Sequence, residues 1–262
     1  MVADAQRLDA AVSAAWVELP PAAEGPVLRC WYARPEAPGS CRGAVLVLPE
    51  VFGLNSWVRG FCSRLAAAGY AALAMPIFAR TAPDLELGYG PDGLAEGRLH
   101  RDQVSAAGVL ADAGRAIAWL QQQRAHPERP VACVGFCFGG HLSLLVASLE
   151  QVALTCDFYG ARVSSFRPGG GPPTLELLPS VGGDLLCVCG QDDPLMPQQE
   201  LEAIEQALRA CASPRRRELV VVPGAGHGFM CDQRDDFRPQ AAAAGWQLLL
   251  DALAASLPAP SP

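Results

Sequence analysis

Residues 131–149, VACVGFCFGGHLSLLVASL, contain the stretch that decides the fold of this chain. The β-branched run Val131–Val134 leads into a glycine-rich turn and then an apolar segment long enough for a helix, which predicts strand, sharp turn and helix. The turn reads G-x-C-x-G-G around Cys137, which is the nucleophile-elbow pattern G-x-S-x-G with sulfur in place of the hydroxyl. In so tight a turn the residues two places before and after the nucleophile need almost no side chain, and Gly135 and Gly139 meet that need.

Cys137 is predicted to lie at the N-terminus of the helix that follows. There the helix dipole and the free N–H groups favour a negative charge, so the position favours a thiolate and a nucleophilic role. The alternative is a buried structural cysteine in an ordinary strand-to-helix turn. We prefer the functional interpretation because loops elsewhere in the chain supply the partners that a nucleophile needs.

The composition excludes several classes of function. The 262 residues fit one large α/β domain or two small ones. With 18% charged residues, a net charge of −7 and no basic stripe, the chain is an acidic globular protein that does not bind nucleic acid. The chain contains no lysine, which excludes Schiff-base chemistry, a lysine base and a P-loop.

The ten cysteines indicate a reducing compartment, because they lack the spacing of a secreted disulfide framework. No C-x-x-C pair is present, so we expect no metal site, and no motif calls for a cofactor. The N-terminal residues carry early acids without the apolar core of a signal peptide, and no run of about 20 apolar residues exists. We therefore expect a cytoplasmic protein that makes no use of a membrane.

Apolar runs and helical patterns alternate along the chain. This alternation predicts an α/β fold in a single domain spanning residues 1–262, with a mostly parallel sheet and helices on both faces. Residues 1–26 are expected to be a weakly specified lead-in, 76–97 a long loop, and 256–262 a frayed tail. The expected strands are 27–33 (an antiparallel edge strand), 43–48, 71–75, 131–134, 152–158, 184–189 and 218–222, and the expected helices are 55–68, 100–124, 198–211 and 240–255.

Chemically active side chains follow several of the predicted strands. In open α/β sheets, ligands bind outside the carboxyl ends of the strands, so these loops are expected to meet. The loops carry Glu50, Cys137, the pair Asp192 and Asp193, and His227. The chain order nucleophile, acid, histidine is the order found in α/β-hydrolases.

His227 is the candidate base. It is the only one of the four histidines that lies in a glycine-rich loop directly after a predicted core strand. A histidine beside a cysteine can hold a thiolate–imidazolium pair, and the imidazolium can later protonate a leaving group. The alternative is an ordinary loop histidine.

The acid that would orient the histidine has three candidates. Asp193, in D-P-L-M-P, is preferred to Asp192, and Asp157 at the end of an earlier strand comes third. The acid is needed to hold the imidazole in one tautomer. Each of these aspartates could instead simply form a turn, because aspartate before proline favours turns.

Two loops offer groups for binding the substrate. The backbone N–H groups of Val51 and Phe138 are expected to form the oxyanion hole, and Glu50 lies in the same loop as Val51. Arg80 begins the long loop. From its position alone, Arg80 is as consistent with holding a substrate carboxylate as with forming a surface ion pair.

At these residues the chain resembles the dienelactone hydrolases (carboxymethylenebutenolidases) of the α/β-hydrolase superfamily. The resemblance extends from about residue 25 to residue 255. The segments that carry it are LPEVFGLNSWVRGFCSRLAAAGYAAL at 48–73, PIFAR at 76–80, VGFCFGGH at 134–141, GQDDPLMP at 190–197 and GAGHGF at 224–229. The elbow cysteine together with the PExFG segment is the most specific pair.

The resemblance implies roles for individual residues. It implies a Cys137–His227–Asp193 triad, a Glu50 that interacts with the thiol and helps to ionise it when substrate binds, and an Arg80 that holds a substrate carboxylate. The family enzymes that act on dienelactone carry a second arginine a few residues after the histidine. Here Met230-Cys231-Asp232 occupies that stretch, and the nearest arginine is Arg234.

The predicted function is therefore a cysteine hydrolase of small lactones or carboxylic esters that needs neither metal nor cofactor. Its partner is a small-molecule substrate, and we expect a monomer or small homo-oligomer. One alternative is a thioesterase or acyltransferase on the same scaffold, because fold does not determine function. Another is a non-catalytic protein that uses an accessible thiol as a redox sensor.

Overall fold

An eight-stranded sheet is the centre of the computed structural model, which describes residues 11–22, 25–37, 41–123 and 128–257. The strand order is β1-β2-β4-β3-β5-β6-β7-β8. Only β2 runs against the other described strands, because it pairs antiparallel with both β1 and β4. The strands are β1 (Val12–Leu19), β2 (Leu28–Pro35), β3 (Gly43–Leu48), β4 (Tyr70–Ala74), β5 (Val131–Phe136), β6 (Val152–Phe158), β7 (Asp184–Gly190) and β8 (Arg217–Val222).

The central strands are apolar along their whole length because both of their faces are covered. All six residues of β3, GAVLVL, are buried. Val45 and Val47 belong to the hydrophobic core on one face, whereas Leu46 and Leu48 belong to the core on the other. This alternation follows from the two-residue period of a strand.

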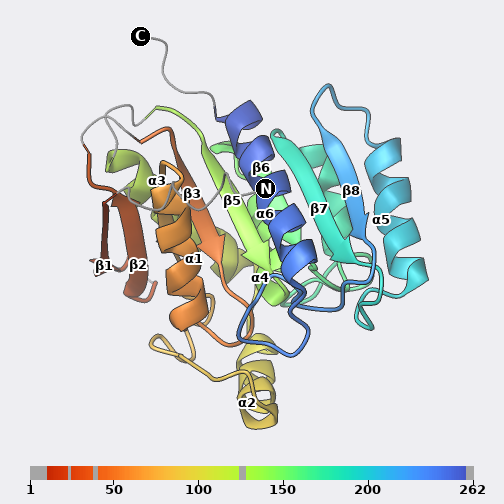
Figure 1. The fold of residues 1–262 in the computed structure, drawn as a ribbon, viewed down its shortest axis with the longest axis horizontal. Coiled ribbons are helices and arrows are strands. Elements are labelled where there is room, and N and C mark those ends of the chain that lie inside the picture. The colour runs from red at the N-terminus through yellow and green to blue at the C-terminus, as the bar shows by residue number, and fades with distance from the viewer. Residues whose placement is uncertain (1–10, 23–24, 38–40, 124–127, 258–262) are drawn as a thin grey trace, which may run out of the picture.

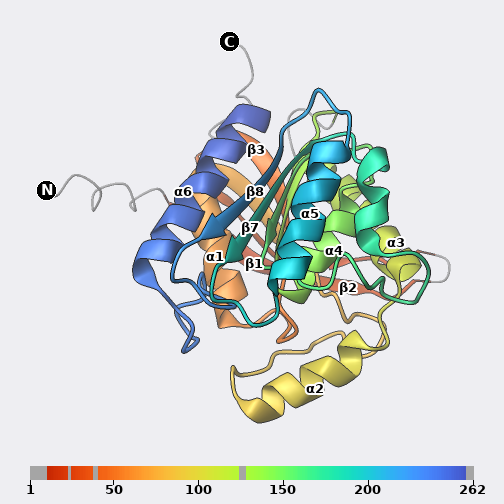
Figure 2. The ribbon, with the colours of Figure 1, turned by 90° about the vertical axis from the view of Figure 1, so that its right-hand side faces the viewer.

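Helices cover both faces of the sheet. Helices α1 (Ser56–Ala67) and α6 (Pro239–Ser256) lie on one face, and α3 (Ala106–Gln122), α4 (Phe138–Val146) and α5 (Gln198–Ala210) lie on the other. Figure 2 shows the sheet between these two layers. A short 3₁₀ helix, η1 (Thr174–Ser180), packs against α4. The chain thus has the predicted mostly parallel sheet with helices on both faces.

Helix α2 (Pro91–Arg101) stands apart from both layers, beyond the end of the sheet toward which the parallel strands point (Figures 1 and 2). Gly97 is its only buried residue. A Cβ atom on Gly97 would lie 2.3 Å from the carbonyl oxygen of Val51, so only glycine lets the helix approach this loop. The helix is therefore held close to one loop that was expected to carry functional groups.

The structure differs from the expected elements mainly near the N-terminus. Strand β1 lies within the stretch expected to be a weakly specified lead-in, and β2 is consequently one place inside the sheet. The sequence VSAAWVEL has no clear alternation, and pairing with β2 is what buries its Leu19 end. Residues 1–10 of the expected lead-in and residues 258–262 of the expected tail lie outside the described part of the chain. Leu257, the last residue described, is buried and not frayed.

Between β4 and β5 the structure has two helices, α2 and α3, where one long loop and one long helix were expected. Residues 91–101 form α2, so the irregular loop is shorter than expected, and the expected helix 100–124 begins only at Ala106. Pro91 starts α2 at a position where its missing N–H costs no hydrogen bond. Across the described residues, no helix has the length and apolar character needed to cross a membrane.

Candidate active site

Cys137 lies at the sharp turn between β5 and α4, as the elbow pattern predicts. Its backbone has φ 54° and ψ −117°, a conformation that is unfavourable for a residue with a side chain. The turn is held by a hydrogen bond in which the Cys137 N–H donates to the Phe158 carbonyl at 3.0 Å. The strain places the thiol at the N-terminus of α4 and at the edge of a cavity.

The glycines on either side of Cys137 are required by close backbone contacts. A Cβ atom on Gly135 would lie 2.0 Å from the carbonyl oxygen of Gly139. A Cβ atom on Gly139 would lie 2.3 Å from the carbonyl oxygens of both Leu48 and Pro49. The elbow is therefore packed directly against the end of β3, which brings the loop after β3 next to the thiol.

His227 and Asp193 form a buried pair in the loops after β8 and β7. The His227 Nδ1–H donates to Asp193 Oδ2 at 2.8 Å, because a carboxylate can only accept. Asp193 Oδ1 accepts a second hydrogen bond from the Leu195 N–H at 2.8 Å. Of the three candidate acids, Asp193 is thus the one paired with the histidine, while Asp192 is exposed and Asp157 accepts from the Gly160 N–H.

The electrostatic environment of His227 favours its protonated form. Burial lowers its pKa, but the negative charge that Cys137 carries when ionised and the hydrogen bond to Asp193 more than offset this effect and raise the pKa to about 10. The other ring nitrogen, Nε2, is buried and has no hydrogen-bond partner among the described residues. This nitrogen is therefore available to exchange a proton with a reacting group.

The two expected oxyanion-hole residues, Val51 and Phe138, border the same cavity as Cys137. Neither of their N–H groups donates a hydrogen bond within the described part of the chain. Phe138 opens α4, so its N–H is one of the groups that a helix cannot satisfy internally. Two unused donors beside a thiol suit a carbonyl oxygen that becomes negatively charged.

Glu50 is held by an arginine from the loop after β8. The carboxylate is 1% exposed, and its Oε1 accepts from Arg234 Nη1 at 2.8 Å. Its Oε2 is buried without a hydrogen-bond partner among the described residues. Burial lowers the pKa of Arg234, but the charge of Glu50 more than offsets this and raises it. In this state Glu50 is an ion-pair partner of Arg234, with one oxygen still unused.

Arg234 occupies the active site although the sequence analysis named it only as the arginine nearest to an expected position. Its guanidinium lies over the rings of Phe52 and Tyr89, 5.8 and 5.9 Å from their centroids. A Cβ atom on Gly228 would lie 2.6 Å from Arg234 Cζ, so the glycine after His227 makes room for this side chain. The G-H-G sequence could have signalled a close approach at this point, but not which side chain makes it.

Tyr159 is a second residue that the sequence analysis missed. It follows β6 with a positive φ of 47°, and its ring packs edge-on against His227 with the centroids 5.2 Å apart. Its hydroxyl is buried without a partner among the described residues. Nothing in the sequence signals a left-handed backbone at a tyrosine, because this conformation is rare outside glycine, asparagine and aspartate.

A cavity of about 380 Å³ at the carboxyl ends of the strands is bordered by Cys137, His227 and Arg234. The side chains around it include four arginines and two histidines, and none of them is acidic. One of the histidines, His141, is neutral at physiological pH, because burial lowers its pKa to about 4. The lining residues are Val51, Phe52, Leu94, Arg98, Arg101, Cys137, Phe138, His141, Ala161, Arg162, Phe166, Pro194, Leu195, Pro197, His227 and Arg234.

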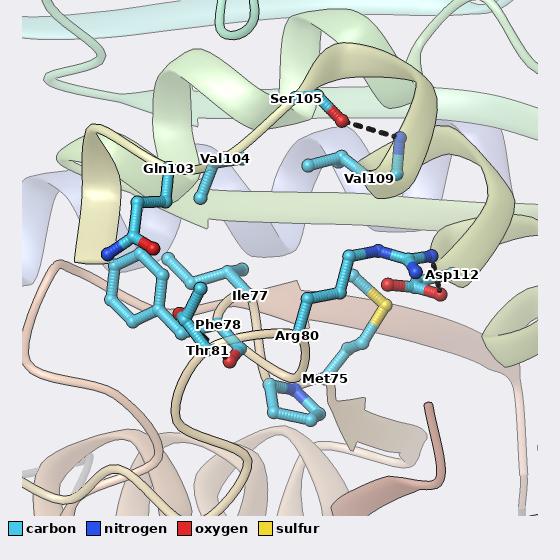
Figure 3. A pocket seen from close by; sticks show the side chains of 12 residues that line it. Met75, Ile77, Phe78, Arg80, Thr81, Gln103, Val104, Ser105, Val109 and Asp112 are labelled. Atoms are coloured by element: carbon cyan, nitrogen blue, oxygen red, sulfur yellow. Dashed lines mark hydrogen bonds and ion pairs between the residues drawn. The ribbon is translucent and has the colours of Figure 1, made fainter. Parts of the chain in front are cut away.

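Arg80 does not reach this cavity. Figure 3 shows it extended toward α3, where its Nη2 donates to Asp112 Oδ1 at 2.9 Å. Arg80 and Asp112 border a separate pocket of only about 20 Å³. The predicted role of Arg80 in holding a substrate carboxylate finds no support in this placement, because a carboxylate of the protein already occupies the guanidinium and Cys137 lies in another cavity.

No cluster of three or more histidine, cysteine or acidic side chains suited to a metal ion occurs among the described residues. The ten cysteines are free thiols, and only Cys41, Cys137 and Cys211 are partly exposed. Of these three, Cys137 alone borders the cavity that His227 and Arg234 line.

Comparisons with known proteins confirm the predicted α/β-hydrolase fold. The model of the dienelactone hydrolase family matches residues 28–257. A Synechocystis sp. protein named "Putative carboxymethylenebutenolidase" is 39% identical over 203 residues, covering 78% of this chain and 82% of that protein. A Salmonella typhimurium protein of the same name is 30% identical over 244 residues, covering 93% and 87%. The crystal structure of a "Putative Dienelactone Hydrolase" from Klebsiella pneumoniae is similar with a TM-score of 0.81 at 28% identity, covering 93% and 99%.

Proposed function

Because this chain belongs to the dienelactone hydrolase family and is thus a carboxylic ester hydrolase, we propose that it cleaves small lactones or esters with Cys137 as nucleophile. The observation that carries this proposal is the buried His227–Asp193 pair, whose histidine lines the same cavity as the strained Cys137. A nucleophile, a base and a group that orients the base are the three parts that acyl transfer through a covalent intermediate requires.

The first half of the reaction forms an acyl-enzyme. The Cys137 thiolate attacks the carbonyl carbon, and the carbonyl oxygen becomes an oxyanion that accepts hydrogen bonds from the N–H groups of Val51 and Phe138. Losing one such donor typically costs about 2.7–4 kcal/mol of transition-state stabilisation. When the tetrahedral intermediate collapses, the C–O bond breaks and the His227 imidazolium gives its Nε2 proton to the departing alkoxide. In a lactone this alcohol remains attached to the acyl group.

The second half returns the enzyme to its starting state. The neutral His227 takes a proton from water, the hydroxide attacks the thioester carbonyl, and the C–S bond breaks to release the acid and the thiolate. Asp193 accepts from Nδ1 throughout, which keeps Nε2 directed at the reacting atoms and stabilises the imidazolium.

Glu50 and Arg234 provide a way to couple substrate binding to activation of the thiol. An anionic group of the substrate beside Arg234 competes with Glu50 for the guanidinium. The released carboxylate, with an oxygen that already lacks a partner, is then available as a base for Cys137 in molecules whose thiol proton has not yet passed to His227. This role follows from the family resemblance, and the resting Glu50–Arg234 pair supports it.

Steady-state hydrolysis of a panel of small lactones and activated esters tests the proposal. We expect Cys137→Ala to lose turnover by at least about 10⁴-fold, whereas Cys211→Ala, which removes another partly exposed thiol, keeps the wild-type rate. With an activated ester, His227→Ala should accumulate a thioester on Cys137 that mass spectrometry detects. Wild-type turnover by Cys137→Ala, or the absence of turnover by wild type on the whole panel, would remove the proposed mechanism.

A further inference from the structure

The positive charge of the active-site cavity exceeds what Glu50 can neutralise. Glu50 pairs with Arg234, which leaves three lining arginines without a carboxylate in the wall of the cavity. These three, Arg98, Arg101 and Arg162, are called the outer arginines below. A cavity lined by one sign of charge raises the local concentration of ligands of the opposite sign.

None of the outer arginines has a buried carboxylate partner among the described residues, and Arg162 lies instead over the ring of Phe166, with its Cζ 4.8 Å from the centroid. Arg98 and Arg162 form no ion pair or side-chain hydrogen bond with any described residue. Arg101 pairs only with its neighbour Asp102, whose side chain is 63% exposed. By contrast, several arginines outside the cavity have carboxylate partners: Arg29 with Asp84, Arg59 with Glu86 and Arg209 with Glu205.

Arg162 sits on a loop that is held rigidly in a strained shape. Its φ is 64°, in the left-handed region that residues with side chains rarely adopt. Such strain persists only where the surroundings enforce it, and it concentrates at functional sites. Three buried side chains hold loop 160–166: Asp157 accepts from Gly160 N at 2.8 Å, His141 donates to Ala161 O at 2.8 Å, and Glu200 accepts from Ser164 N at 3.0 Å.

Arg98 and Arg101 come from a different wall of the cavity, helix α2. Gly97 packs this helix directly on the carbonyl of Val51, so the position of the two arginines is tied to the oxyanion-hole loop. The cavity is thus bordered by arginines from two elements far apart in sequence, each held at a defined place relative to Cys137.

We propose that the outer arginines form an anion subsite, so that the preferred substrates carry a second anionic group, a carboxylate or a phosphate, besides the one beside Arg234. Arginine suits this task because its planar fork binds either oxyanion through two parallel hydrogen bonds. The inference rests on the proposed function for its catalytic meaning. The subsite itself binds anions whether or not the protein turns over an ester, so binding and hydrolysis can be tested separately.

Calorimetric titration with simple acids tests the subsite. Succinate, glutarate and adipate are compared at constant ionic strength with butyrate, valerate and hexanoate, which have the same carbon counts and one carboxylate. We expect the best dicarboxylate to bind wild type at least about tenfold more tightly than its monocarboxylate match, a difference of about 1.4 kcal/mol. 3-Phosphonopropionate against succinate distinguishes a phosphate preference from a carboxylate preference.

Variants then locate the effect. Arg98→Gln and Arg162→Gln should each reduce the preference for the dicarboxylate several-fold and leave monocarboxylate binding unchanged. Arg209→Gln is the matched control, because it removes the same charge from an exposed ion pair on α5 and should change neither affinity. An equal loss in all three variants would show a general charge effect and overturn the proposal.

The remaining outcomes also decide the question. Equal affinities of mono- and dicarboxylates, or no binding by any of them, would overturn the subsite even if esters are hydrolysed. A dicarboxylate preference that requires Arg98 and Arg162 supports the subsite even in a protein that hydrolyses no ester of the panel, in which case only the proposed function fails.

Discussion

Asp192 and Asp193 are neighbours in the sequence, yet their surroundings give them different roles. Asp193 is buried and accepts hydrogen bonds from His227 and the Leu195 N–H, whereas Asp192 points to solvent. Residue type and spacing could narrow the choice of acid to these two. Only the path of the loop after β7 determines which side chain faces the imidazole.

We predict that Asp193→Asn lowers kcat by about 10⁴-fold, because an amide neither stabilises the imidazolium nor enforces the same tautomer. Asp192→Asn is the matched control and should keep kcat within about twofold, as expected for an exposed surface position. Ester hydrolysis under saturating substrate gives both values. Equal activities of the two variants would remove Asp193 from the triad.

Asp157 is the third acid considered from the sequence, and it is fully enclosed behind the elbow. Burial raises its pKa to about 7, although the hydrogen bond from the Gly160 N–H acts in the opposite direction. The folded protein therefore holds this proton at pH values where the unfolded chain, with an ordinary pKa near 3.8, has lost it. The carboxyl group thus makes the folded state less favourable as pH rises from about 4 to 7.

We predict that Asp157→Asn removes this pH dependence, because the amide oxygen can still accept from Gly160 and carries no charge. The variant should gain stability over wild type between pH 4 and pH 8, by up to about 4 kcal/mol at the upper end. Urea unfolding at several pH values measures the difference. A stability difference that stays constant with pH would contradict the elevated pKa.

At the scale of elements, helix α2 shows how one glycine positions a whole segment. Gly97 is the only buried residue of this helix, and it is the point at which the helix packs on the loop that contains Val51. Helix propensity alone favours alanine over glycine by roughly 0.5–1 kcal/mol. Packing predicts the opposite result, because a Cβ atom would lie 2.3 Å from the Val51 carbonyl oxygen.

We predict that Gly97→Ala destabilises the protein by about 1–3 kcal/mol and lowers kcat/KM by moving the oxyanion-hole loop. Gly114→Ala is the control, since its Cβ atom on α3 would meet no atom within 4 Å and should stabilise by roughly 0.5–1 kcal/mol. Thermal unfolding and ester hydrolysis together test both changes. A stabilised, fully active Gly97→Ala protein would show that α2 does not depend on this contact.

At the scale of the whole molecule, a network of ion pairs and hydrogen bonds connects the β1–β2 pair of strands to helix α3. Asp112 on α3 pairs with Arg80 at 2.9 Å and with Arg115 at 3.0 Å. Arg115 also donates to the carbonyls of Pro20 and Pro26, at 2.9 Å each, in the connection between β1 and β2. The network joins three stretches of chain, and it gives Arg80 a structural position away from the active site.

We predict that Asp112→Asn destabilises the protein by about 2 kcal/mol, because two arginines lose the carboxylate they share. This figure allows for Arg80, which is 40% exposed and partly solvated. The melting temperature should fall by roughly 5 °C for a chain of this size. Glu205→Gln, which breaks an exposed pair with Arg209, should change the stability by less than about 0.5 kcal/mol, and equal effects would count against the network.

The sequence by itself determined the parallel sheet, the elbow at Cys137 and the loops that carry the functional groups. These features depend on neighbours in the chain: continuous apolar runs predict strands covered on both faces, and the tight turn requires Gly135, whose Cβ atom would lie 2.0 Å from the carbonyl oxygen of Gly139. Local patterns also placed His227 directly after a strand, at the end of the sheet where Cys137 lies. That strand, β8, is however the edge of the described sheet and not the core strand that was expected.

Only the tertiary structure decided which charged groups meet. Glu50 and Arg234 are 184 residues apart, and their ion pair exists because the loops after β3 and β8 converge over the elbow. The family resemblance implies that Arg80 binds substrate, but its side chain pairs with Asp112 on α3. A charged side chain takes the partner that packing brings within reach, and that partner is set by distant segments rather than by the residues beside it in the sequence.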